Sequence, residues 1–338
     1  MRGAKVTDIL LKYFLIFIGL TIFLFTVYKF VPIAVIKNDF PGNSIQVLGI
    51  NRNIVFQYFY FLRSLLTGNM GYSNTSFYSG TVYSAVSITI PETLLFLGVT
   101  FAISYMVSYF IGIYSGTVFK TAKIVNMNIF PLLFLYLVSG LILLAVFSGI
   151  LGWLPSHGIL SSSSAALNGW VSSTGSSIYT TSPTNIIFID SIIHGSSSIF
   201  LNFLKHMALP FFSLFIPTTV YLGVFISHEA SIEYNKKYMR AGISRNAFMD
   251  SYTIYIKRGI RSRIFREMKS VFVIFMGGMV IVSYIFSYMN TGEFAIYSFL
   301  NYDYGIMGGI YSFFVLAIIV IIFDLFIDII NRGGRNEI

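Results

Sequence analysis

Few residues of this 338-residue sequence carry groups that could act as nucleophiles, general bases or metal ligands. The chain has no cysteine, which excludes disulfides, thiol catalysis and cysteine-bound metals. It has four histidines: His157, His194, His206 and His228. None of them shows H-E-x-x-H spacing or stands in a cluster of carboxylates. We therefore expect no metal site.

Two other catalytic motifs, an intramembrane serine nucleophile and a phosphate loop, are incomplete or absent in the sequence. Ser115 lies between glycines in Gly112-Ile-Tyr-Ser115-Gly116, as a nucleophile within a membrane could. No histidine stands in a predicted span to act as its base, so packing is the favoured interpretation. The sequence also lacks a G-x-x-x-x-G-K-[ST] phosphate loop. If the chain works with ATP, a separate nucleotide-binding chain is implied.

Two acids stand in the last apolar run. Asp324 and Asp328 are four residues apart, so they share one face of a helix. Acids inside a membrane are candidates for function. These two come shortly before Arg332 and Arg335, so we favour a helix cap or an ion pair at the interface.

The charged residues gather in residues 227–270, which hold ten of the 22 Lys and Arg but only four acids. The cations are Lys236, Lys237, Arg240, Arg245, Lys257, Arg258, Arg261, Arg263, Arg266 and Lys269. Near the centre, residues 238–244 form a short helix-turn-helix pattern that we expect to break at Gly242, because glycine permits a turn. We interpret this basic segment as a cytoplasmic handle held by a soluble partner.

The composition places the chain in a bilayer. It is 56% hydrophobic and 10% charged, with a mean hydropathy of +0.77, whereas soluble domains carry roughly 25% charged residues. In a membrane protein basic residues collect on the cytoplasmic side, so the net charge of +9 does not indicate nucleic-acid binding. The first apolar run exceeds the 7–15 residues, roughly, of a signal-peptide core, so we expect a retained transmembrane helix.

The hydropathy predicts an all-α membrane protein of about six transmembrane helices. The apolar runs are 9–31, 93–116, 124–151, 209–226, 271–288 and 305–330, and a helix of about 20 residues crosses a bilayer. With both termini in the cytoplasm, 17 of the 22 cations lie inside, as the positive-inside rule requires. The chain then divides into 1–31, an external loop 32–92, and a core 93–338 with an external loop 153–205 and the cytoplasmic segment 227–270.

The predicted external loops carry three features. Residues 53–66 are aromatic-rich and could form an interfacial helix, and Asn74-Thr75-Ser76 is a possible glycosylation site. Residues 156–198 are rich in serine and could form a mobile loop or a functional lid. Residues 289–304 are expected to be a short polar connection.

Small residues recur every fourth position in the second predicted span. They are Ser104, Ser108, Gly112 and Gly116. This spacing lines one helix face and lets another helix approach closely. We favour tight packing over a role in lining a path for a substrate.

Several motifs, in their order and spacing, resemble the permease subunits of ABC transporters, and most closely the B-type subunit of the dipeptide/oligopeptide/nickel class. The first are Gly68-Asn-Met-Gly71-Tyr72-Ser73, similar to Gly-Asp-Leu-Gly-x-Ser, and Pro91-Glu-Thr93-Leu94, similar to Pro-x-Thr-Leu. The later ones are Gly152-Trp153-Leu154-Pro155, Lys205-His206-x-x-Leu209-Pro210, Asn301-Tyr-Asp303-Tyr304 and Asp328 in the last span. The resemblance covers nearly the whole chain.

The basic segment corresponds in this resemblance to the loop that docks on the ATPase, roughly Asp-Tyr-x-Arg-x-Ala-x-Ala-x-Gly-Leu-Ser. Glu233-Tyr234 matches its opening and Gly242-Ile243-Ser244 its close, while Tyr238 stands where alanine is usual and the final Leu-Pro is missing. The docking residues so implied are Glu233, Tyr234, Tyr238, Arg240, Ala241, Gly242, Ile243, Ser244, Arg245, Phe248 and Asp250. The apolar ones would seat the loop in a groove and the arginines would pair with acids of the partner.

The resemblance implies a permease subunit of an ABC importer in the plasma membrane. Its partners would be a second permease, two ATPase subunits that bind ATP and Mg, and an external solute-binding protein, with no cofactor bound by this chain. Di- or oligopeptides are the first expectation for the substrate, oligosaccharides the second and nickel the third.

Three alternatives remain open. A self-contained secondary transporter or channel would show ionisable residues within its spans or two similar halves, and neither is clear. A membrane enzyme would need a catalytic constellation. The basic segment could also be a solvated loop attracted to anionic lipid.

Overall fold

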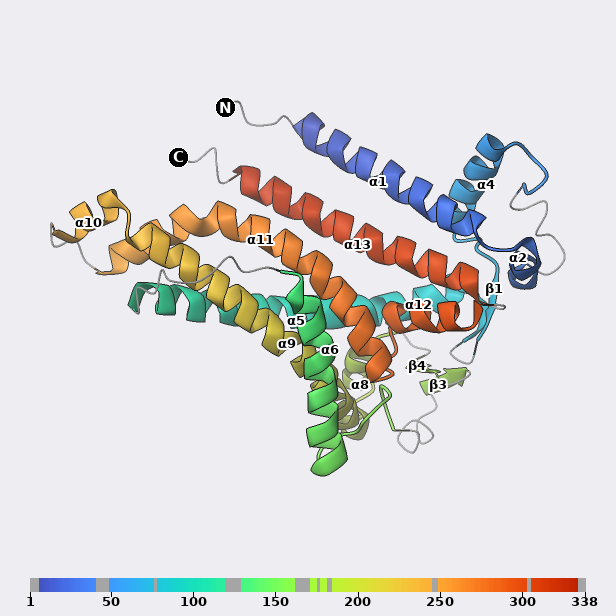
Figure 1. Cartoon of the computed structure of the whole chain (residues 1–338). Helices are drawn as coiled ribbons and strands as arrows, with labels where there is room; N and C mark the ends of the chain where they lie inside the picture. The colour runs from blue at the N-terminus through green and yellow to red at the C-terminus, as the bar shows by residue number, and fades with distance from the viewer. Residues whose placement is uncertain are drawn as a thin grey trace.

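A computed structural model describes residues 6–40, 49–75, 78–118, 129–161, 171–174, 177–180, 184–244, 249–302 and 305–333. Within them the chain is almost entirely helical, with two short antiparallel hairpins (Figure 1). Six of the described helices are long and apolar enough to cross a membrane. The prediction of an all-α membrane protein with about six such helices is confirmed.

The six long helices are α1 (Val6–Lys29), α5 (Val82–Val118), α6 (Pro131–Leu143) with its π-helical end η1 (Leu144–Ile150), α9 (Ser197–Tyr234), α11 (Met249–Ile285) and α13 (Ile306–Gly333). The shorter elements are α2 (Ile33–Asp39), α4 (Ile54–Thr67), β1 (Tyr72–Asn74), β2 (Ser79–Thr81), β3 (Val171–Thr174), β4 (Ser177–Thr180), α8 (Ile187–Ile193), α10 (Lys237–Ser244) and α12 (Thr291–Leu300).

Three of the long helices exceed the predicted spans. α5 and α11 have 37 residues and α9 has 38, about 55 Å each, compared with roughly 30 Å for a hydrocarbon core. The predicted spans begin at Thr93 and Leu209, but α5 and α9 begin earlier in the chain and continue through Pro91 and Pro210. Neighbouring helices can satisfy the backbone groups that a proline frees within a membrane.

The predicted third span is shorter in the structure. α6 begins at Pro131, where a proline in the first turn removes no helical hydrogen bond. Residues 124–128 of the predicted span lie outside the described residues. At its other end the helix widens into η1, which stops at Ile150.

The core joins helices that are distant in sequence. α5 packs along α9, and this is the most extensive helix–helix contact in the described part of the chain. Around Phe101 of α5, three rings from α11 and α13 lie at centroid distances of 5.1, 5.3 and 5.6 Å: Phe272, Phe275 and Phe323. Edge-to-face aromatic contacts of this kind stabilise a core beyond the area they bury.

The two ends of the bundle differ in what they carry. The start of α1, the end of α13 and α10 lie at one end, and α2, α4, β1 and α12 at the other (Figure 1). This arrangement is the one expected if the termini and the basic segment share one side of a membrane.

The prediction of a short polar connection over residues 289–304 is wrong. These residues contain α12, whose Thr291, Glu293 and Phe294 are buried and which packs on α13 and α11. The side chain of Asn290 accepts a hydrogen bond from the Glu293 backbone N–H at 3.0 Å, which caps the helix. The polar residues at this position are typical of a loop in sequence, but in the structure they form the start of a helix.

The predicted external loops are partly ordered elements. The aromatic stretch 53–66 forms α4, and its Phe61 stacks on Tyr28 of α1 with ring centroids 5.1 Å apart. Asn74 is exposed at the end of β1. In the predicted external loop 153–205, residues 197–205 belong to α9, and β3, β4 and α8 are further ordered elements. Residues 162–170, 175–176 and 181–183 of that loop lie outside the described residues.

Candidate functional site

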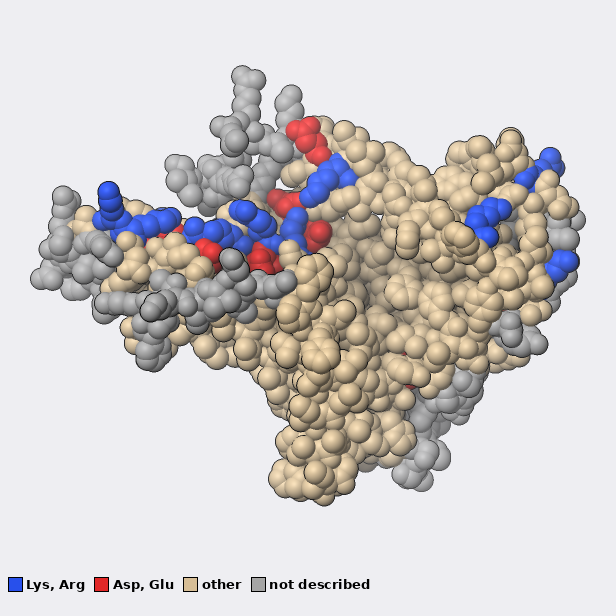
Figure 2. Space-filling model, viewed as in Figure 1, with Lys and Arg blue, Asp and Glu red and all other residues tan. Residues whose placement is uncertain are grey.

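The basic segment consists of the end of α9, the short helix α10 and the N-terminal half of α11. Figure 2 shows its lysines and arginines, interspersed with acids, at one end of the molecule. α9 continues to Tyr234, and the chain turns at Asn235 and Lys236 before α10 begins. The break predicted at Gly242 is wrong, because Gly242 lies within α10. One glycine costs a helix only about 1 kcal/mol, which need not end it.

A cluster of ionic contacts centres on Glu233 in the last turn of α9. Its Oε2 lies 2.7 Å from Lys236 Nζ and 2.7 Å from Nη2 of Arg263 on α11. Tyr238, at the start of α10, donates its hydroxyl to Glu233 Oε1. Arg263 Nε also lies 2.5 Å from Oε2 of Glu229, one turn earlier on α9. We call these five residues the Glu233 cluster.

The carboxylate at its centre faces inward. The side chain of Glu233 is only 2% exposed, so it is not available as a surface contact for a docking partner. Gly259 of α11 makes room for it, because a Cβ there would lie 2.5 Å from the Glu233 Cδ. The close approach of α11 to the end of α9 therefore depends on this glycine.

Tyr238 connects the cluster to the surface, since it is 52% exposed. Partial burial, with the hydrogen bond to the Glu233 carboxylate, raises the pKa of Tyr238 to about 12. The phenol therefore keeps its proton at neutral pH and remains a hydrogen-bond donor to Glu233.

For the other implied docking residues, the structure describes side-chain exposure, the backbone alone, or neither. Tyr234 is half-buried and Ala241 is exposed. For a further group only the helical backbone is described: Arg240, Gly242, Ile243 and Ser244 in α10, and Asp250 in α11. Arg245 and Phe248 lie outside the described residues.

Beside the cluster, α11 presents cations to its surroundings. Lys257, Arg258, Arg261 and Arg266 are exposed. Among the described residues, none of the four forms an ion pair with an acid. Arg261 lies over the ring of Phe265, 5.4 Å from its centroid.

The four small residues of α5 lie buried, facing α9. Ser108 donates a hydrogen bond to the Thr219 carbonyl at 3.0 Å. A Cβ on Gly112 would lie 2.7 Å from Ile226 Cβ, and one on Gly116 would lie 2.5 Å from the Ser227 carbonyl oxygen. Ser104 bonds back to the Thr100 carbonyl of its own helix at 2.7 Å. The stripe is a packing face in this structure.

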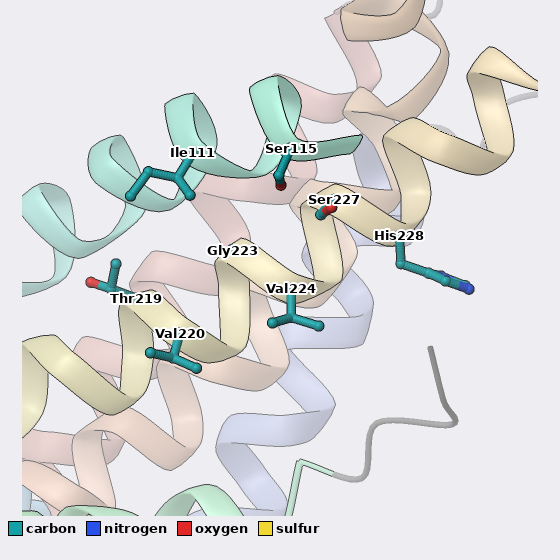
Figure 3. A pocket seen from close by; sticks show the side chains of 8 residues that line it. All are labelled: Ile111, Ser115, Thr219, Val220, Gly223, Val224, Ser227 and His228. Carbon is teal, nitrogen blue, oxygen red and sulfur yellow. The ribbon is translucent and has the colours of Figure 1, made fainter. Parts of the chain in front are cut away.

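A groove of about 280 Å³ runs between α5 and α9. Ser115, Ser227 and His228 line it together with Gly223 (Figure 3). The expectation that no histidine stands in a span is wrong, because α9 extends far enough to include His206 and His228. The His228 ring nevertheless points away from both serines in Figure 3, and its Nδ1 lies 4.0 Å from Glu229. A nucleophile–base pair is not assembled here.

The two acids of α13 have different surroundings. Asp328 lies 2.5 Å from Lys269 of α11 and 3.4 Å from Lys12 of α1, and it accepts the Tyr13 hydroxyl at 2.7 Å. Asp328 therefore forms ion pairs with lysines of two other helices; an ion pair was one of the two interpretations that the sequence favoured. Asp324 is half-buried, and its Oδ1 has no hydrogen-bond partner among the described residues.

A buried polar network, which sequence reasoning missed, lies towards the other end. Glu92 of α5 accepts the hydroxyl of Tyr288, while its Oε2 is buried without a hydrogen-bond partner among the described residues. Thr93 accepts a hydrogen bond from the Thr291 backbone N–H at 2.9 Å. Glu92 stood just before the predicted span. Only an extension of that span through Pro91 would have placed it within a membrane helix.

His206 has a structural role. It is buried on α9, and its Nδ1 lies 3.0 Å from the carbonyl oxygen of Gly158 and 3.1 Å from that of His157. It therefore holds the segment after η1 against α9. Among the described residues, no group of three or more histidines and acids could hold a metal ion.

Comparisons with family models and with curated proteins do not assign this chain to a family. No protein-family model matches the chain, and no curated protein matches it.

Proposed function

We propose that this chain is one permease subunit of an ABC importer in the plasma membrane. A second permease would complete the path, two ATPase chains would supply ATP and Mg chemistry, and an external solute-binding protein would deliver the substrate. Di- or oligopeptides are the proposed substrates, with oligosaccharides second. The termini and the basic segment are proposed to be cytoplasmic.

The observation that carries this proposal is the placement of α10. An eight-residue helix connects two helices long enough to cross a membrane and to extend beyond it. A short helix seated in a groove of a soluble partner can act as a lever on the helices that flank it. Two features support an ATPase that is a separate chain. The sequence has no phosphate loop, and the exposed cations of α11 would suit an ATPase with an acidic docking surface.

A self-contained secondary transporter is the second candidate, and Glu92 favours it. An acid buried within a membrane helix, with one oxygen unpartnered among the described residues, is typical of proton and ion pathways. It would need no ATPase.

Co-purification tests the two candidates. The chain is extracted in mild detergent with an affinity tag, and co-purifying proteins are identified by mass spectrometry. We expect a second six-helix permease and ATPase chains that contain phosphate loops. A stable homo-oligomer without any ATPase would contradict the proposal and support the secondary transporter.

A matched pair of variants locates the contact. Lys257→Glu with Arg258→Glu reverses two exposed charges on α11, and Arg52→Glu with Arg63→Glu reverses two exposed charges at the other end of the molecule. We expect the first variant to lose the ATPase and the second to keep it. Equal retention by both would show that the ATPase does not dock at the basic segment.

A further inference from the structure

One carboxylate joins three helices in the basic segment. Glu233 itself belongs to α9, Tyr238 to α10 and Arg263 to α11. Tyr238 contacts Oε1 of the Glu233 carboxylate and Arg263 contacts Oε2. Lys236, in the turn between α9 and α10, occupies a third position around it. Through this one carboxylate, Tyr238 of α10 is connected to Arg263 of α11.

The surroundings make this junction stiff. Glu233 is 2% exposed, and charge-assisted hydrogen bonds in a site of low dielectric are short and directional. Arg263 also contacts Glu229, so it spans two successive turns of α9. Below the junction, Met239 of α10 and Ile256 and Ile260 of α11 are buried. A displacement of α10 that moves Tyr238 therefore acts on Glu233 and, through it, on Arg263.

We propose that Glu233 is a positioning residue whose carboxylate links α10 to α9 and α11, so that movement of α10 is transmitted to both long helices. This inference rests on the proposed function, because the ATPase partner supplies the movement. It assigns Glu233 a role within the chain, whereas the resemblance placed it among the contacts to the ATPase.

Spin labels test the link in the chain itself. Because the sequence has no cysteine, Lys237→Cys on α10 and Lys257→Cys on α11 give two exposed labels without background. Their distance distribution is measured by double electron–electron resonance in the purified chain. We expect a narrow distribution in the parent chain, and one at least twice as wide in Glu233→Gln and in Tyr238→Phe.

Tyr238→Phe keeps the result interpretable if Glu233→Gln fails to fold, since it removes only the hydroxyl that reaches α10. Glu267→Gln is the matched control. Glu267 of α11 accepts the hydroxyl of Tyr221 on α9 at 2.6 Å, so it joins the same two long helices without contacting α10. We expect its distribution to remain narrow. Unchanged widths in Tyr238→Phe, or equal broadening in the control, would overturn the inference.

A second pair of labels tests transmission in the complex. Ser270→Cys on α11 and Ile322→Cys on α13, two exposed positions outside the cations assigned to docking, report movement of α11. A non-hydrolysable ATP analogue is added to the complex that retains its ATPase. We expect a shift of this distance in the parent chain, and less than half of that shift in Tyr238→Phe. An equal shift in both would overturn the inference while leaving the proposed function intact. If the parent chain purifies without an ATPase, the proposed function is contradicted, whatever the distances between the labels at positions 237 and 257 show.

Discussion

Buried carboxylates lie at both ends of the bundle, and the two ends hold them in different ways. At the end that carries α10, buried Glu233 and partly exposed Asp328 meet lysine and arginine side chains. Towards the other end, Glu92, Asp39 and Glu293 form no ion pair with any described residue. A carboxylate in apolar surroundings without a cation binds a proton more readily.

Two of these acids lie outside the membrane-spanning helices. Burial raises the pKa of Glu293 to about 8. Burial also raises the pKa of Asp39 to about 7, although the backbone N–H of Met307 donates a hydrogen bond to it at 3.1 Å and opposes the rise. Both carboxyls therefore titrate within the range of ordinary buffers.

Glu293 should make the stability of the folded chain depend on pH. Because its folded-state pKa is raised, the folded chain binds the proton more tightly than the unfolded chain. The stabilisation is complete below 4.5, the ordinary pKa of a glutamate, and is lost as the pH rises through about 8. We expect the apparent unfolding temperature in detergent to fall by several degrees over that window.

The variant Glu293→Gln removes this titration and should flatten the curve. Parallel pH curves for the parent chain and Glu293→Gln would show that the carboxyl does not change its protonation on folding.

Among the elements, the contact between α5 and α9 is governed by glycine. Gly112 and Gly116 face α9 with no room for a Cβ, whereas a Cβ on Gly98 of the same helix would meet nothing within 4 Å. The same residue type is therefore required at two positions of α5 and optional at a third.

Gly116→Val should separate the two helices and destabilise the chain by about 1–3 kcal/mol, the usual cost of overpacking. Gly98→Val is the control and should leave the unfolding midpoint nearly unchanged, since its surroundings are open. Midpoints are compared by thermal unfolding in detergent. A similar loss in both variants would mean that the effect comes from helix propensity and not from the α5–α9 contact.

Many of the helices and one of their packing faces could be predicted from the sequence. Apolar runs predicted six membrane helices, and small residues at four-residue spacing predicted the face of α5 that packs. The apolar runs start at Thr93 and Leu209, whereas α5 and α9 begin at Val82 and Ser197, because tertiary contacts hold both helices together beyond their apolar runs and through Pro91 and Pro210. The burial of α12 and the inward turn of Glu233 depend on residues far away in sequence, such as Arg263, so the local pattern does not contain them.

At the scale of the whole molecule, the bundle has a cationic end with α10 and an opposite end with α4 and the buried acids Asp39, Glu92 and Glu293. This polarity predicts the orientation in the membrane. Single cysteines at Lys237, on α10, and at exposed Tyr72, on β1, can be labelled against a cysteine-free background.

A membrane-impermeant maleimide should label Tyr72→Cys in intact cells and Lys237→Cys only in inside-out vesicles. The positive-inside rule is the physical reason, because cationic segments stay in the cytoplasm. The reverse labelling pattern would place the basic segment outside the cell and would exclude docking of a cytoplasmic ATPase on it.

The central claim is that α10 contacts an ATPase, and cross-linking from α10 tests it most directly. A photoreactive amino acid replaces exposed Lys237, and in a control it replaces Phe30, which is 83% exposed at the far end of α1. After irradiation of cells, the cross-linked products are identified by mass spectrometry. We predict that position 237, but not position 30, captures a protein that carries a G-x-x-x-x-G-K-[ST] phosphate loop. Efficient cross-links from position 237 to lipid or to other copies of this chain, with no such protein, would contradict the account.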